Sequence, residues 1–311
     1  MAAQPRVAPL HIKAYLDRLY ATYDLSYLPT SAAQFPHRYH RPEDIEVAGF
    51  IASCFAYGRV EGFTPPIEAL LAVLGDHPYR SLLAFDPRRD AGRLRAFSYR
   101  FNTARDALCL LWFLRQTLER YGSLRACYLA GYRDRDEDTR PALTAFVSKF
   151  LQLDPRPVYG KGRLSPGMHH LLPSPARGGA CKRLHLFLRW MVRQDHIDFG
   201  LWPELPPAKL IIPLDTHVAQ VSRRLRLTRM KSPGLAMALE ITENLKRFDP
   251  ADPVKYDFAL CRLGMLSRSP KTSASGSAEQ FGPELTAEGL TVEASVEPSD
   301  IRGPRSEGKD R

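Results

Sequence analysis

Apolar residues recur at helical spacing along the first half of the chain. Glycines and capping residues mark where these helices start and stop. The first apolar face is formed by Ile12, Leu16, Leu19, Tyr20 and Tyr23. Further helices are expected from Pro42 to near Gly58, from Pro65, capped by Thr64, to Gly75, and over Ala104–Tyr121, closed by Gly122.

The second half is helical too, with one interruption. Pro155–Pro175 is rich in Pro, Gly, His and basic residues without a clear apolar period, which predicts a long loop of the kind that is often functional. Helices are expected over Thr139–Leu153, Ala180–Val192, Asp215–Leu225, Pro233–Phe248 and Pro253–Leu266. Because no convincing strand-like alternation occurs, the sequence predicts an all-α protein.

Composition separates a helical region, residues 1–270, from residues 271–311. The second part is rich in Ser, Glu, Gly and Pro, which predicts a disordered tail. The formal net charge is +10, and the tail carries 5 basic and 8 acidic residues, so the helical region alone carries +13. This charge suggests a polyanionic partner such as nucleic acid, although a solvated arginine-rich surface would produce the same value.

Several classes of protein are not indicated. No apolar run is long enough to span a bilayer, and Met1–Pro9 lacks the apolar stretch of a signal peptide. We therefore expect a cytoplasmic protein without membrane contact. The five cysteines are widely spaced and form no C-x-x-C pair, so neither a zinc site nor an iron–sulfur cluster is expected.

Two glycines precede a predicted helix that carries a lysine in its first turn. Gly178 and Gly179 permit a tight turn and leave N–H groups free for a phosphate. At Lys182 the positive end of the helix dipole and the adjacent Arg183 disfavour a charged ammonium, which is one way to make a lysine nucleophilic. The alternative is an ordinary turn with a solvated lysine.

A second motif reads Pro213-Leu214-Asp215-Thr216-His217. Asp215 is expected to cap the helix that follows, and a capping carboxylate can also face a cleft. His217 is expected to be a hydrogen-bonded structural side chain. No metal site is expected, since His169, His170 and Asp198 are candidate ligands by composition alone.

Together the two motifs resemble the active-site core of the helix-hairpin-helix DNA glycosylases. The resemblance implies that Gly178 and Gly179 form a hairpin that grips a DNA phosphate, that Lys182 attacks C1′ of the damaged nucleotide, and that Asp215 assists. The Lys–Asp separation of 33 residues is similar to the archaeal 8-oxoguanine glycosylase branch rather than the iron–sulfur endonuclease branch. The hairpin departs from the superfamily, which has Gly-x-Gly where this chain has Gly-Gly.

The resemblance implies a two-lobed helical fold with a central cleft and an active-site core at about residues 155–230. It implies base-excision repair of a damaged base, for example an oxidised purine, with an associated AP-lyase activity. The expected partner is double-stranded DNA bearing a damaged base or an abasic site, bound by a monomer associated with the nucleoid. No cofactor is expected, and a monovalent cation at the hairpin is left open.

Longer strings within residues 10–265 are similar to a bacterial family of conserved hypothetical proteins of unknown function. They place the chain without naming a substrate. The strings are Pro36-His37-Arg38, Asp44-Ile45-Glu46-Val47-Ala48-Gly49-Phe50, Ala180-Cys181-Lys182-Arg183-Leu184, Leu186-Phe187-Leu188-Arg189-Trp190-Met191-Val192-Arg193 and Asp252-Pro253-Val254-Lys255-Tyr256-Asp257-Phe258-Ala259-Leu260.

Removing a base requires an aromatic or apolar pocket and cations for the phosphates. Trp202 is the preferred stacking residue, with Phe199 and His217 completing the expected pocket; Tyr57 and Trp190 are further aromatic candidates. The expected phosphate contacts are Arg38, Arg177 and Arg183, followed by Arg59, Lys161 and Arg163.

Three functional hypotheses remain open on the sequence. The first is a DNA glycosylase with lyase activity. The second is a non-catalytic nucleic-acid-binding protein that keeps the fold and the hairpin. The third is a different enzyme on the same scaffold, acting on RNA or on a nucleotide, because a fold alone does not establish a function.

Overall fold

Helices form almost all of the regular structure in residues 9–266, the part of the chain that the computed structural model describes. The predicted all-α class is thereby confirmed; the expected disordered tail lies outside the described residues. The helices are α1 (Pro9–Thr22), α2 (Pro42–Phe55), α3 (Val60–Leu74), α4 (Pro78–Leu83), α5 (Ala104–Tyr121), α6 (Leu124–Leu129), α7 (Arg140–Leu151), α8 (Arg156–Tyr159), α9 (Pro166–Leu171), α10 (Lys182–Val192), α11 (Thr216–Arg224), α12 (Leu235–Lys246) and α13 (Asp257–Leu266).

Helix α5 has the bounds that the sequence predicts. Thr103 and Asp106 form a reciprocal capping box at its start, and Gly122 adopts a left-handed conformation, with φ of 79°, at its end. The predicted first position of α2, Pro42, is confirmed as well. Capping interactions therefore fix both ends of α5, and a proline at the first helical position marks the start of α2.

Helix α3 differs from the prediction at its start. It begins at Val60, so that Pro65 and Pro66 lie inside the helix and Thr64 is not its cap. The Thr64 hydroxyl instead donates a hydrogen bond of 2.8 Å to the Val60 carbonyl oxygen. The two prolines lie close enough to the N-terminus to cost only a few backbone hydrogen bonds, and the apolar face outweighs that loss.

The expected long loop between Pro155 and Pro175 is partly helical. Two short helices, α8 and α9, occupy it. Each begins with a proline in its first turn, and Ser165 caps α9 through a hydrogen bond from the Met168 backbone N–H. The segment is too short and too polar for either helix to show a clear apolar period.

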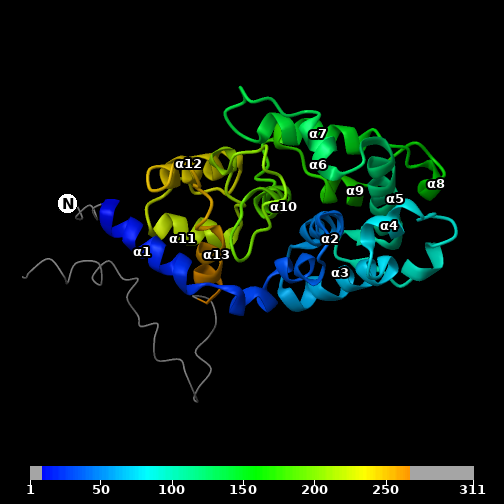
Figure 1. Ribbon diagram of the computed structural model, residues 1–311, viewed down its shortest axis with the longest axis horizontal. Coiled ribbons are helices and arrows are strands. Elements are labelled where there is room, and N and C mark those ends of the chain that lie inside the picture. Colours follow the sequence, from blue (N-terminus) through cyan, green and yellow to red (C-terminus); the bar gives the residue numbers. More distant parts are fainter. Residues whose placement is uncertain (1–8, 267–311) are drawn as a thin grey trace, which may run out of the picture. The chain divides into compact units, whose positions relative to one another are not determined.

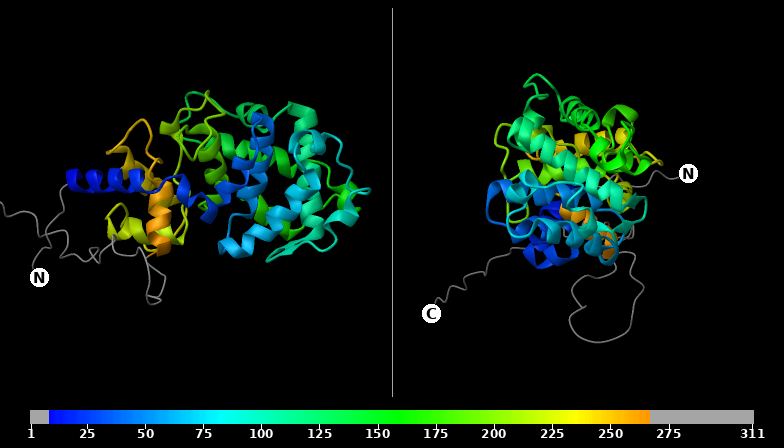
Figure 2. Two further views of the ribbon diagram at one scale, coloured as in Figure 1. Left: turned by 60° about the horizontal axis from the view of Figure 1, so that its bottom comes forward. Right: turned by 90° about the vertical axis from the view of Figure 1, so that its right-hand side faces the viewer.

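Helix α2 lies at the centre of the described core. Every residue of α2 from Asp44 to Phe55 is buried, so this helix is enclosed on all sides. It packs against α10, α3 and α4. Figures 1 and 2 show α3 to α9 grouped around α2, and α11 to α13 gathered beside α1. Of the helices that pack on α2, α10 is the one that connects the two groups.

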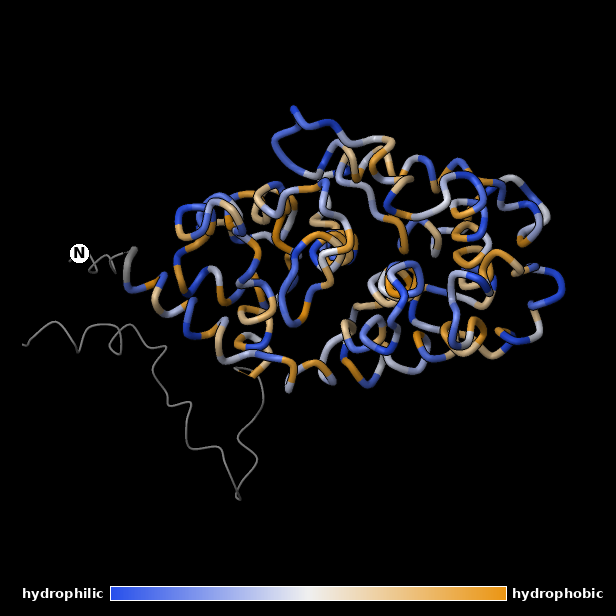
Figure 3. Tube along the Cα trace, viewed as in Figure 1, coloured by the Kyte–Doolittle hydropathy of each residue, from blue (hydrophilic) through white to orange (hydrophobic). Residues whose placement is uncertain are grey.

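The amphipathic character of the other helices is visible along the chain. Figure 3 shows apolar and hydrophilic positions alternating along most of them, as expected for helices that bury one face. No helix in residues 9–266 is both long and apolar enough to cross a membrane.

A short hairpin is the only sheet in the described residues. Strands β1 (Ser98–Tyr99) and β2 (Asn102–Thr103) pair antiparallel, with Ser98 opposite Thr103 and Tyr99 opposite Asn102. Arg100 and Phe101 form the turn between them. Such short strands are below the length at which an alternating pattern can be recognised, so the sequence did not predict them.

Candidate functional site

Helix α10 starts abruptly after a left-handed turn. Gly178 has φ of 75°, and Cys181, the residue before the helix, has φ of 45° and ψ of 35°. Because the left-handed conformation cannot continue into an α-helix, Lys182 becomes the first helical residue. Its side chain consequently lies at the positive end of the helix dipole.

Asp215 caps α11, as predicted. Its Oδ1 atom accepts hydrogen bonds from the backbone N–H groups of His217, at 2.9 Å, and Val218, at 2.8 Å. These two bonds fix the carboxylate at the start of the helix. Its second oxygen, Oδ2, remains free to face other side chains.

The structure brings Lys182 and Asp215 together. Lys182 Nζ lies 3.4 Å from Asp215 Oδ2 and also donates a hydrogen bond of 3.4 Å to the carbonyl oxygen of Ala56, at the end of α2. The Lys182 side chain is 29% exposed and the Asp215 side chain 18% exposed. The pair therefore joins three elements, α10, α11 and the end of α2, while solvent still reaches it.

Burial and charge act in opposite directions on Asp215. Burial by itself raises the pKa of this carboxyl, but the Lys182 ammonium and the backbone hydrogen bonds from Val218 and His217 outweigh it. The net result is a pKa below the ordinary value. Asp215 is therefore a carboxylate near neutral pH, able to stabilise positive charge that develops beside it.

Two residues of α13, which the sequence reasoning did not assign, complete the surroundings of Asp215. Cys261 Sγ lies 3.7 Å from Asp215 Oδ2, and burial raises the pKa of this thiol to about 12, so that it stays protonated and donates. Asp257 lies one turn earlier on the same face of α13. Its spacing of four from Cys261 is a helical pattern, but nothing in the sequence shows that α13 packs against α11.

A close approach brings α13 against α11. A Cβ atom on Gly264 would lie 2.7 Å from His217 Cβ and 2.9 Å from the His217 carbonyl oxygen, too near for any side chain. Gly264 therefore permits the contact between the two helices that places Cys261 beside Asp215.

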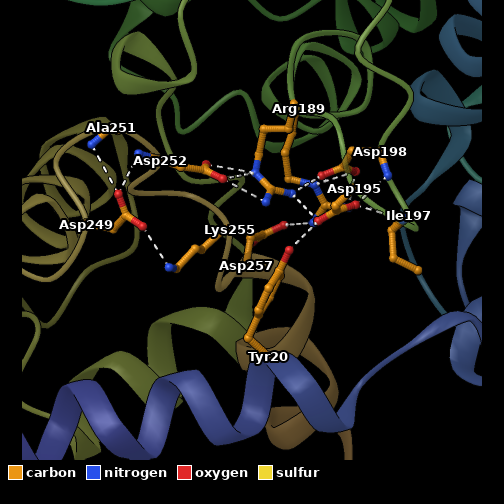
Figure 4. Close-up of polar contacts among 11 residues, drawn as sticks. Tyr20, Arg189, Asp195, Ile197, Asp198, Asp249, Ala251, Asp252, Lys255 and Asp257 are labelled. Carbon is orange, nitrogen blue, oxygen red and sulfur yellow. Dashed lines mark hydrogen bonds and ion pairs between the residues drawn. The ribbon is translucent and has the colours of Figure 1, made fainter.

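Asp257 also belongs to a buried network of ion pairs (Figure 4). Its Oδ2 accepts a hydrogen bond of 2.5 Å from Arg189 Nη1, whereas its buried Oδ1 has no hydrogen-bond partner. Arg189 also contacts Asp198, and Arg193 contacts Asp198 as well. Further carboxylates complete the set around Arg193, namely Asp195 and Asp252.

Two guanidinium groups thus face four carboxylates. An excess of negative charge in a buried place favours the retention of a proton. Burial, outweighing the nearby Arg189, raises the pKa of Asp257 to about 6, and Asp215 pushes it in the same direction. Asp257 therefore interacts electrostatically both with the buried network, through Arg189, and with the Lys182–Asp215 pair.

The residues expected to bind DNA phosphates occupy different environments. Arg177, Gly178 and Gly179 are exposed on the turn before α10. Arg38 is engaged by Glu68 through two hydrogen bonds, of 2.8 and 2.6 Å. Arg183 is buried: it donates to the carbonyl oxygens of Cys54, at 2.5 Å, and His170. The structure therefore gives Arg183 an internal role in holding α10.

The expected base-pocket residues are not brought together. Trp202 is fully buried, with its ring 5.3 Å from that of Phe187 and its Nε1 donating to Glu46 at 2.9 Å, so it is a core residue. Phe199 is half-buried and packs on His37. His217 packs against Gly264, and its buried Nδ1 has no hydrogen-bond partner. Of the three, only His217 adjoins Asp215.

Two surface cavities lie away from the Lys182–Asp215 pair. One, of about 540 Å³, is lined among others by Arg38, Glu68 and His77. The other, of about 430 Å³, is lined among others by His37 and Phe199. Neither is lined by Lys182. The geometry of the charged pair, rather than cavity size, identifies the candidate site.

No group of three or more His, Cys, Asp or Glu side chains in residues 9–266 is arranged to hold a metal ion. Lys182 and Asp215 offer the chemistry of an amine and a carboxylate in contact.

Comparison with known proteins places the chain in a family. No curated protein and no solved structure matches it. A family model described as a protein of unknown function, DUF2400, matches residues 32–266, which is well over half of the chain. This agrees with the similarity to a family without an assigned function that the sequence strings indicate. The chain therefore belongs to the DUF2400 family.

Proposed function

We propose that the protein is a DNA glycosylase with AP-lyase activity, acting on a damaged base such as an oxidised purine. The observation that carries the proposal is the 3.4 Å contact between Lys182 Nζ and Asp215 Oδ2 at the starts of two helices. The resemblance of the two motifs to helix-hairpin-helix DNA glycosylases suggested this pair. The exposed turn of Arg177, Gly178 and Gly179 supports it, because a cation beside a helix N-terminus suits a phosphate. The backbone N–H groups of Arg177 and Gly178 are not available for this contact, since they donate to the carbonyl oxygens of Ser174 and Pro175.

In the proposed reaction the Lys182 ammonium first gives a proton to Asp215 or to water. The neutral amine attacks C1′, and the damaged base leaves with the electron pair of the glycosidic bond and takes up a proton. Loss of the ring oxygen bond produces a protonated Schiff base between Nζ and C1′. Removal of a C2′ proton then expels the 3′ phosphate by β-elimination, and water releases Lys182.

Asp215 has two separable roles in this scheme. Its Oδ1 caps α11, and its Oδ2 faces the lysine. Asparagine caps a helix about as well as aspartate but lacks the charge. Asp215→Asn is therefore expected to fold normally while slowing base release by about 100-fold or more, the usual size of a general acid–base contribution.

The test is covalent trapping with borohydride. Wild type is incubated with duplexes containing an abasic site or 8-oxoguanine, reduced, and compared with Lys182→Gln and Asp215→Asn. Lys246→Gln, which removes a surface lysine paired with Glu243 at 2.7 Å, is the matched control. Trapping by wild type and Lys246→Gln but not by Lys182→Gln is expected. Trapping that survives in Lys182→Gln would contradict the assignment of the nucleophile.

One observation favours the second candidate function, a nucleic-acid-binding protein without catalysis. Lys182 is held at once by Asp215 and by the Ala56 carbonyl oxygen, and neither of the two cavities includes it. A lysine with a purely structural role would make the same two contacts. The absence of trapping on every damaged duplex, together with DNA binding that is retained in Lys182→Gln, would establish this second function.

A further inference from the structure

The tip of the β1–β2 hairpin carries an exposed aromatic side chain. Phe101 is 67% exposed, more than any other large apolar residue in the described part of the chain. An isolated exposed apolar residue needs no explanation by itself. Phe101, however, is one end of a row of rings that leads to the candidate site.

The row runs from Phe101 through His170 to Tyr57. The Phe101 and His170 ring centroids are 4.9 Å apart, and those of His170 and Tyr57 are 5.0 Å apart. Tyr57 directly follows Ala56, whose carbonyl oxygen accepts the hydrogen bond from Lys182 Nζ. Arg183, the neighbour of Lys182, lies over the Tyr57 ring at 4.9 Å. The aromatic row therefore begins beside Lys182 and ends at solvent.

The hairpin is held rigidly at its base. The Tyr57 hydroxyl donates a hydrogen bond of 2.8 Å to Asn102 Oδ1, and the Asn102 side-chain amide donates one of 3.0 Å to the Gly167 carbonyl oxygen. Tyr99 packs on Tyr57 with ring centroids 4.8 Å apart. Because the base is fixed, the exposed position of Phe101 belongs to the fold and does not result from a loose loop.

The hairpin carries one arginine without an acidic partner in the described residues, and a second one follows the segment that this arginine contacts. The Arg100 guanidinium lies over the Tyr57 and Tyr99 rings and against Gly58, where a Cβ atom would meet Arg100 Nη2 at 2.7 Å. Arg59 follows Gly58 and is exposed. Neither arginine has an ion pair within residues 9–266, in contrast to Arg38. An exposed ring flanked by unpaired cations matches the chemistry of a base attached to a phosphate backbone.

We propose that Phe101 stacks on an unstacked nucleobase of bound DNA, next to the nucleotide that reaches Lys182. The proposal rests on the proposed DNA substrate but needs no chemistry at Lys182. It assigns the hairpin tip, which no sequence motif marks, to binding DNA that contains an unpaired or displaced base. The neighbouring Arg100 supplies the contact to the backbone of the same strand.

The test measures DNA binding in a Lys182→Gln background, so that trapping and strand cleavage do not interfere. Each protein is titrated with a duplex containing a single-base bulge and with a fully paired duplex of the same length. Phe101→Ala is expected to weaken binding to the bulged duplex by about 10-fold or more, the usual effect of losing one stacked base. Its binding to the paired duplex is expected to change by less than about 2-fold.

Two further variants separate stacking from simple apolar contact. Phe101→Leu keeps an apolar surface without a π-face and is expected to behave like the alanine variant. Phe101→Trp is expected to bind like wild type and to show quenched tryptophan emission on the bulged duplex, relative to wild type with its own three tryptophans. Leu83→Ala, which truncates an exposed leucine at the end of α4, is the matched control and is expected to have no effect.

Three results would overturn the proposal. The first is equal affinity for the bulged duplex with phenylalanine or alanine at position 101 of the Lys182→Gln protein. The second is tryptophan emission of Phe101→Trp that does not change at saturating DNA. The third is the absence of binding to either duplex. A loss of self-association instead of DNA binding in Phe101→Ala would show that the hairpin docks on protein. If the wild-type protein is not trapped by borohydride but binding to the bulged duplex still depends on Phe101, the glycosylase activity is rejected and the role of Phe101 in DNA binding is kept.

Discussion

Helix α10 carries two sets of charges that are arranged in opposite ways. At its start, Lys182 meets one carboxylate at a place that solvent reaches. Arg189, two turns later, and Arg193, the first residue after the helix, are almost fully enclosed and meet several carboxylates. In the sequence all three are basic residues close together, and only their surroundings in the fold distinguish Lys182 from the two arginines.

The contrast shows how a candidate site can be told from a structural network. Buried ion pairs are satisfied by many hydrogen bonds and hold elements in place, and breaking one leaves an uncompensated charge. The Lys182–Asp215 pair remains partly accessible to solvent, and its two charged groups meet through one contact of 3.4 Å. The ion pair itself is expected to contribute less to stability than the enclosed network does, and solvent can reach it.

The largest effect on stability is expected from Asp198→Ala, which removes the carboxylate that both arginines share. Two buried guanidinium groups lose a partner, and the free energy of unfolding should fall by about 3–5 kcal/mol. Urea denaturation followed by circular dichroism measures this change. Glu243→Ala, which breaks an exposed pair with Lys246, should cost less than about 1 kcal/mol. Similar losses of stability in Asp198→Ala and Glu243→Ala would contradict the distinction between buried and solvent-exposed ion pairs.

A smaller effect that depends on pH is expected from Asp257→Asn. The folded-state pKa of Asp257 is raised to about 6, so the folded protein binds a proton more tightly than the unfolded chain does. Its contribution to stability is full below about pH 4 and is lost as the pH rises through 6. Asparagine never ionises. The free energy of unfolding of the variant, relative to that of wild type, should therefore rise by about 1–3 kcal/mol between pH 4 and pH 7.

The measurement is the difference between the unfolding free energies of the two proteins across that range. Asp249→Asn is the control, because its pairing with Lys255 holds the pKa of Asp249 below the ordinary value despite partial burial. Asp249 is ionised in both states from about pH 5 upward, so its difference curve should be flat between pH 5 and pH 7. A flat curve for Asp257→Asn as well would mean that Asp257 does not retain its proton.

The smallest effect is expected from Arg177→Gln, at the exposed turn before α10. Loss of one phosphate contact should weaken DNA binding about 2- to 3-fold and reduce the slope of log affinity against log salt by about 1. Arg183→Gln should instead destabilise the fold, because Arg183 binds backbone carbonyl oxygens. Titrations at several salt concentrations, paired with thermal unfolding, measure both. An unchanged salt slope in Arg177→Gln would exclude it from a DNA interface.

Local signals predicted much of the secondary structure. The capping box and Gly122 define α5, and Asp215 caps α11 as expected, because these interactions involve neighbours in sequence. Thr64 was misread as a cap, since the apolar face of α3 extends past the prolines. The hairpin tip at Phe101 carries no pattern that a sequence could reveal.

The candidate site was predicted only in part. Lys182 and Asp215 were selected from two motifs, and the structure places them in contact. Their separation from Trp202 could not be predicted, because the position of an aromatic ring in a core depends on how distant helices pack. The same reason explains why Asp257 and Cys261 were missed: they reach Asp215 through the packing of α13 on α11.

Lys182 and Arg189 are seven residues apart on α10, so their side chains leave the helix within about 20° of the same direction. A helix held only by apolar side chains can roll about its axis at modest cost, since one methyl group replaces another. Here Arg189 is fixed by directional hydrogen bonds to Asp198 and Asp257 on two sides. The network therefore sets the rotational angle of the helix, and the direction in which Lys182 points is determined about 10 Å away from it.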